Sequence, residues 1–216
     1  MALSWPIALT EFFDTLPIQQ VTCHLGRSVT ASQTGGGDLI SHQVGERLWQ
    51  GQIILGKDYH RQFAAIEARI ALLEESGASL LVYDTRMAGP RGDPSGALLG
   101  TSVVRIDTLD ANNRDLTLKD LPAGYVISQG DLLGFSYGSN PVRYAFHRVV
   151  TGAIAGSGGI TAKIEVIPWI RQGAATGTVV TLVKPVCKAK IMVAEYGNST
   201  ATVSTGGTLN WMQTLR

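Results

Sequence analysis

The stretch from 101 to 184 constrains the fold most, because it holds seven short apolar runs within about 80 residues. Glycine-rich turns such as Gly156–Gly159 separate these runs. Strands this short and this closely spaced are typical of a small barrel or sandwich. The predicted strands lie at 103–106, 116–118, 125–127, 132–137, 144–150, 160–167 and 179–183.

The regions on both sides of this stretch predict a second β structure. Apolar and polar residues alternate over 21–25 and 29–31, and 48–55 places Trp49, Ile53 and Leu55 on one face. Strand character resumes at 186–193 and 201–211. We therefore expect a discontinuous, β-sandwich-like domain of residues 1–100 and 185–216, interrupted by a β-barrel of residues 101–184.

One amphipathic helix is predicted within the first of these regions. Apolar residues recur at steps of three and four, which is the spacing of one helix face. Asp58 is expected to cap the helix start, and Gly77 to follow its end. The residues on the buried face are Phe63, Ile66, Ile70 and Leu73.

Composition limits the partners of the chain. Eighteen basic and 17 acidic residues give a net charge of +1, so no broad electrostatic attraction to nucleic acid or an anionic membrane is expected. No run approaches the roughly 18 apolar residues of a membrane span, and 1–17 lacks the pattern of a secretion signal, so a soluble chain is expected. Cys23 and Cys187 match no metal or redox spacing, which predicts buried free thiols.

The sequence offers no convincing catalytic or metal site, so we predict a protein that is not an enzyme and takes no metal or cofactor. The four histidines are scattered, and His147 is predicted to lie on the polar side of its strand, at the surface. Gly134–Gly138 spells G-x-S-x-G, but it lies between two predicted strands, whereas a nucleophile elbow needs a following helix.

Several segments, taken in order, resemble one family. RLWQGQIIL, AAIEARIALLEESG and SLLVYDTR are followed by AGYVISQGDLLGF and GGITAKIEVIPWIR. This order resembles the distal tail protein of long-tailed, siphovirus-like bacteriophages and gene transfer agents. The part ending in Tyr83-Asp84 is similar to the ring-forming belt domain of that family, and the later part to its inserted galectin- or OB-like domain.

The resemblance implies a structural role in the virion, at the tip of the tail, after synthesis in the host cytoplasm. Distal tail proteins form a hexameric ring between the tail tube protein and the hub and fibre proteins, with the inserted domain pointing outward. DNA passes through the channel of the ring without specific binding. A net charge near zero suits such a channel, because a strongly basic lumen would hold each phosphate that it met.

The edge of the belt sheet is where we expect contacts between subunits, because an edge strand carries unpaired N–H and C=O groups. The alternative, that these strands pair only within one subunit, remains open. The candidate contact residues are Val21, Cys23, Leu25, Val29, Trp49, Ile53 and Leu55.

A second hypothesis is that the inserted barrel is a carbohydrate-binding module of the tail tip or baseplate. Tyr125, Tyr137, Tyr144 and Trp169 could present aromatic faces to a sugar. Most of them also stand at the alternating positions of a core. A ring protein should assemble with itself, whereas a lectin should stay monomeric and respond to a glycan.

Overall fold

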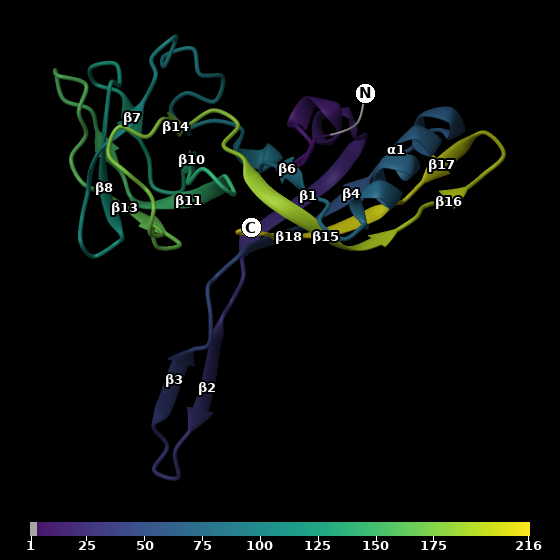
Figure 1. Cartoon of the computed structure of the whole chain (residues 1–216), viewed down its shortest axis with the longest axis horizontal. Helices are drawn as coiled ribbons and strands as arrows, with labels where there is room; N and C mark the ends of the chain where they lie inside the picture. Colours follow the sequence, from purple (N-terminus) through teal and green to yellow (C-terminus); the bar gives the residue numbers. More distant parts are fainter. Residues whose placement is uncertain (1–3) are drawn as a thin grey trace.

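The computed structural model describes residues 4–216 and is mainly β, which confirms the predicted fold class. Three parts can be distinguished in Figure 1: a sheet accompanied by one long helix, a small barrel, and a two-stranded hairpin that projects away from both.

The first part is built on an antiparallel sheet of five strands. Two of these strands come from the end of the chain and lie between strands from its first half, so the sheet is completed only when the C-terminal segment returns. In sheet order the strands are β1 (Ile18–Leu25), β4 (Trp49–Leu55), β18 (Thr208–Gln213), β15 (Cys187–Glu195) and β6 (Leu80–Val82).

The predicted helix is present as α1 (His60–Leu73), and its buried residues are the four expected ones. The predicted cap at Asp58 is wrong. The helix begins after Tyr59, which makes no side-chain capping bond. Asp58 instead lies in β5 (Asp58–Tyr59), where its backbone pairs with Ser204.

Short elements complete this part. The strand β5 joins a three-stranded sheet in the order β16-β17-β5, located beyond the far end of the β15–β18 pair (Figure 1). Three 3-10 turns flank the sheet strands in the sequence. These elements are β16 (Asn198–Ser199), β17 (Val203–Thr205), η1 (Leu9–Glu11), η2 (Phe13–Thr15) and η3 (Thr85–Met87).

A single apolar cluster joins the sheet, α1 and the N-terminal turns. Trp49, Phe12, Phe13 and Phe63 are among its fully buried side chains. A β-sandwich would cover the sheet with a second sheet, whereas here α1 contributes to the core, because its apolar stripe needs to be buried.

The second part is a barrel whose six-stranded sheet is nearly closed. At the two ends of this sheet, Ile106 N–H donates to Thr178 O (2.9 Å) and Val180 N–H donates to Val104 O (2.8 Å). These hydrogen bonds connect the first and the last strand of the sheet. In sheet order the strands are β14 (Val180–Thr181), β10 (Leu132–Tyr137), β11 (Arg143–Thr151), β13 (Ile164–Ile167), β8 (Asp115–Lys119) and β7 (Arg105–Leu109).

A further pair, β9 (Val126–Ile127) and β12 (Ala153–Ile154), lies beside the barrel sheet. The barrel encloses its own apolar cluster, which runs from Val104 to Leu182. Ile106, Leu118 and Ile164 are fully buried in it.

The chain enters and leaves the barrel at neighbouring points. Lys184 N–H donates to Ala88 O (2.6 Å), so the outgoing and returning segments lie side by side. The two cores also touch: Phe146 of β11 packs in the first cluster, and the indole Nε1 of Trp49 donates to Phe146 O (2.7 Å). Their rings meet edge to face at 4.9 Å.

The third part is the hairpin of β2 (Val29–Gln33) and β3 (Leu39–Gln43), which we call the arm (residues 27–47). Its ten strand residues are all exposed. It continues from the ends of β1 and β4 and projects away from the rest of the chain (Figure 1).

Candidate inter-subunit interface

Three of the predicted contact residues stabilise their own subunit. Trp49, Ile53 and Leu55 are fully buried in the first core. Their strand, β4, has β1 on one side and β18 on the other, so both of its edges are used within the chain. The prediction of a subunit contact through β4 therefore does not fit the structure. Alternation reveals which face of a strand is buried, but not whether the strand is central or at an edge.

The other predicted strand, β1, does lie at an edge of the five-stranded sheet. Val21 and Cys23 point into the first core, and Leu25 packs against it, so their side chains are not offered to a neighbour. What β1 can offer is its outer backbone edge. Burial raises the pKa of the Cys23 thiol to about 12 and that of Cys187 well above its usual value. Both cysteines are free and buried, as predicted.

Part of the β1 edge is already occupied. Asp84 is fully buried and accepts two hydrogen bonds from the Arg86 guanidinium, at 2.9 and 2.8 Å. Held in this way, Arg86 also donates to Cys23 O (2.9 Å). The neighbouring stretch 18–22 lines a shallow groove with Thr85 and Arg86, of about 640 Å³. A strand from a neighbouring copy that paired with β1 would therefore have to use residues 18–22.

Val29 is the one predicted contact residue that lies on the arm. Three further apolar side chains of the arm are exposed with it: Leu39 (73%), Ile40 and Val44 (72%). A two-stranded hairpin on its own is marginally stable in water, and solvent-exposed apolar side chains add nothing to its stability. An arm of this composition is typical of a segment that becomes covered in an assembly.

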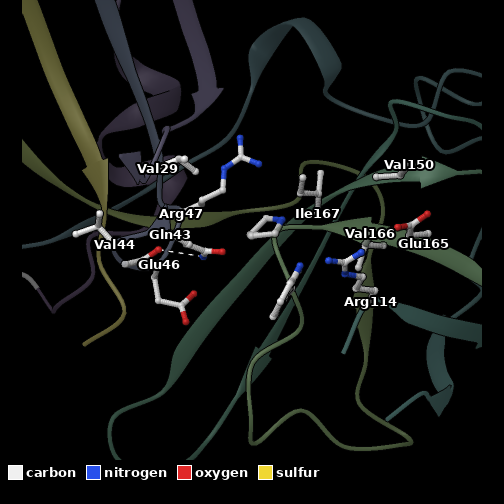
Figure 2. A pocket seen from close by; sticks show the side chains of 13 residues that line it. Val29, Gln43, Val44, Glu46, Arg47, Arg114, Val150, Glu165, Val166 and Ile167 are labelled. Atoms are coloured by element: carbon white, nitrogen blue, oxygen red, sulfur yellow. Dashed lines mark hydrogen bonds between the residues drawn. The ribbon is translucent and has the colours of Figure 1, made fainter. Parts of the chain in front are cut away.

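A cleft of about 720 Å³ lies between the base of the arm and the barrel. Figure 2 shows Val29, Val44 and Glu46 on the arm side, and Ile167, Glu165 and Arg114 on the barrel side. Arg171 of the barrel forms an ion pair with Glu46 of the arm base, at 3.4 Å. Both the arm and the barrel therefore shape this cleft.

Trp169 is the main aromatic group of the cleft. It is 52% exposed, and the Arg114 guanidinium lies 4.8 Å from its ring centre, in the range of a cation–π contact. The other aromatic residues considered for sugar binding are placed differently. Tyr125 and Tyr137 are buried in the barrel core, and Tyr144 is half-buried.

The prediction of a surface position for His147 is wrong. The ring is buried, stacks on Phe135 at 5.4 Å, and its Nδ1 lies 2.8 Å from Pro168 O. Burial, with a smaller contribution from Arg171, lowers its pKa to about 4, although the hydrogen bond to Pro168 acts in the opposite direction. His147 faces the inside of the barrel because it shares a strand face with Ala145, which the sequence pattern did not reveal.

Other groups considered for chemistry lie apart from one another. Ser136 of the G-x-S-x-G sequence is an exposed residue near the end of β10, and the next element is the strand β11. Within residues 4–216, no three His, Cys, Asp or Glu side chains are grouped as metal ligands would be. In the same residues no helix has the length and hydrophobicity needed to cross a membrane.

No protein-family model matches the chain, and no curated protein matches it.

Sequence reasoning did not identify the residues of β3, nor the residues of the cleft other than Val29 and Trp169. Leu39, Ile40 and Val44 follow the glycine-rich turn at 35–37. The signal that could have revealed the hairpin was the pairing of two short polar–apolar runs around that turn. No sequence signal connects Trp169 to the arm, because they are more than 120 residues apart.

Proposed function

We propose that this chain is a structural protein of a phage-like tail tip, which assembles into a ring between the tail tube and the hub or fibre proteins and leaves a channel for DNA. The observation that carries this proposal is the arm, because all ten strand residues of this projecting hairpin are exposed. The resemblance of the sequence to distal tail proteins supports the same role.

Several different surfaces are available for contacts between copies. They are the tip of the arm, the outer edge of β1 and the cleft between the arm base and the barrel, and they are unlike one another. Contacts between unlike patches give head-to-tail association, which closes into a ring when the rotation per copy allows it. Six copies are expected from the resemblance alone.

The barrel suits a different role in the same assembly. Its sheet is nearly closed, so few backbone groups at its edges are available for pairing. Its loops and exposed side chains are what it can present to hub or fibre proteins. A net charge of +1 is compatible with DNA that passes through the ring without being held.

We infer further that the protein is not an enzyme. The side chains that could react are placed as parts of the fold. Both thiols and His147 are buried in cores, and Ser136 lies in a regular strand. Asp84, also buried, is paired with Arg86.

The test is electron microscopy of the purified chain, alone and mixed with the matching tail tube protein. We expect closed rings of uniform diameter that bind one end of the tube. Leu118→Asp, which disrupts the barrel core, serves as a control for nonspecific association of unfolded chain. A chain that stays monomeric at high concentration, both alone and with the tube protein, would contradict the proposal.

A second candidate function is saccharide binding, which the exposed Trp169 in the cleft favours. An indole face beside Arg114 and Glu165 could stack on a sugar ring and hydrogen-bond its hydroxyl groups. Titration with cell-surface glycans, followed by tryptophan fluorescence, tests this function. A saturable change that is lost in Trp169→Ala would support it.

A further inference from the structure

We propose that the tip of the arm of one copy binds in the cleft between the arm base and the barrel of the next copy. This inference rests on the proposed ring assembly and names the surfaces that would form it. The occupant of the cleft is thus a second copy of this chain.

The tip of the arm has the features of an inserted segment. Leu39 and Ile40 are exposed beside the turn, where they contribute nothing to the core of their own subunit. All ten residues of the strand pair are exposed, so only another molecule could bury their apolar side chains. Asp38 gives the segment 32–41 a charge of −1.

The cleft has matching properties. Val44, Pro168 and Trp169 provide an apolar lining, and the volume of about 720 Å³ can receive several side chains. Its surface is concave and is formed by two parts of the chain, the arm base and the barrel (Figure 2).

The charges of the cleft complement those of the arm tip. Among its lining residues, Glu46 is neutralised by the ion pair with Arg171. Arg47, Arg114 and Glu165 then leave a net charge of +1. Arg114 stacks on Trp169 at the exposed side of the cleft, where a carboxylate such as that of Asp38 can approach it.

The tip of the arm is too far from the cleft of its own copy to fill it. About nine residues separate the base of the arm from its tip, which corresponds to roughly 30 Å of extended strand. Because the cleft lies at the base, an arm tip that fills it has to come from another copy. The contact is head-to-tail, so each copy gives one tip and receives one, as ring closure requires.

Two classes of variant test this arrangement. Leu39→Asp damages the tip, and Trp169→Ala or Val44→Asp damages the cleft; all three residues are exposed, so the fold should persist, which circular dichroism verifies. Ile154→Asp, at an exposed apolar residue of the barrel outside the cleft, is the matched control.

Each damaged variant should require at least about tenfold more protein for half-maximal assembly than the wild type, as expected when an apolar anchor is lost. The control should assemble normally. An equal mixture of tip-damaged and cleft-damaged chains should give a species of twice the chain mass, because one intact tip meets one intact cleft, and the other ends of the pair are blocked.

The outcomes separate the two proposals. Normal rings from both cleft variants would overturn the arm-in-cleft contact and leave the ring assembly standing. A wild-type chain that never associates would overturn both. Glycan binding that is lost in Trp169→Ala, while Leu39→Asp assembles like the wild type, would assign the cleft to a saccharide and overturn this inference.

Discussion

The barrel and the arm are both made of antiparallel strands, but they differ in whether the strand edges are hydrogen-bonded and whether apolar side chains are buried. In the barrel, backbone hydrogen bonds connect the end strands, and a buried cluster of apolar side chains fills the interior. In the arm, both edges are open and the apolar side chains lie in solvent.

Because of this difference, we expect the barrel to contribute to the stability of one subunit and the arm to contribute to association between subunits. The barrel core contributes to the folding of one subunit, since its apolar surface is already removed from water. The arm adds little to that stability and retains apolar surface that can be buried later, between copies. Substitutions should therefore change unfolding in one region and association in the other.

The largest effect is expected for Leu118→Asp in the barrel. Leu118 is fully buried, so the carboxylate would be placed in the barrel core without a partner. We expect the free energy of unfolding to fall by more than about 4 kcal/mol, as measured by urea denaturation. A loss below about 1 kcal/mol would mean that this core is not packed as described.

Acidification should destabilise the barrel through His147. Because the folded state holds the pKa near 4 and the unfolded state near 6.5, the unfolded chain binds more protons in this window. The free energy of unfolding should thus fall by about 3 kcal/mol from pH 7 to pH 4 through this residue. His147→Leu should remove that part of the pH dependence, and identical pH profiles for the two proteins would disprove the buried position.

Trp49→Phe tests the contact between the two cores. The substitution keeps most of the apolar volume but leaves Phe146 O without the indole donor. A loss of about 2 kcal/mol is expected, since a buried carbonyl would be left unpaired. Trp169→Phe, at an exposed indole, is the matched control and should leave the unfolding curve almost unchanged.

The smallest effect on unfolding is expected in the arm. Leu39→Asp makes the same change as Leu118→Asp, but at an exposed position. The free energy of unfolding of the monomer, measured by urea denaturation, should change by less than about 0.5 kcal/mol. A large loss in the monomer would show that the arm supports the fold of its own subunit, and the contrast with the barrel would fail.

Much of the fold could be predicted from the sequence because strong local patterns encode it. The stripe of Phe63, Ile66, Ile70 and Leu73 identified the helix, and the alternation from Trp49 to Leu55 identified the buried face of β4. Both patterns reflect burial within one element, which a sequence records directly.

The interface could be predicted only in part, because edges and clefts depend on distant segments. Nothing near β4 in the sequence shows that β18, about 160 residues later, covers its second edge. His147 was misplaced for a related reason: polarity suggested a surface position, while the face of β11 that it shares with Ala145 is turned inward. The environment of Trp169 likewise arises only when arm and barrel come together.

In the proposed assembly, the exposed arm drives head-to-tail association into a closed ring. Sedimentation velocity of the wild-type chain and of Leu39→Asp, over a wide concentration range, tests it most directly. We expect the wild type to form one discrete oligomer, a fixed multiple of 23.0 kDa, and Leu39→Asp to be a folded monomer at concentrations at which the wild type is assembled. A wild-type chain that sediments as a 23.0 kDa monomer throughout, or a variant that assembles equally well, would contradict it.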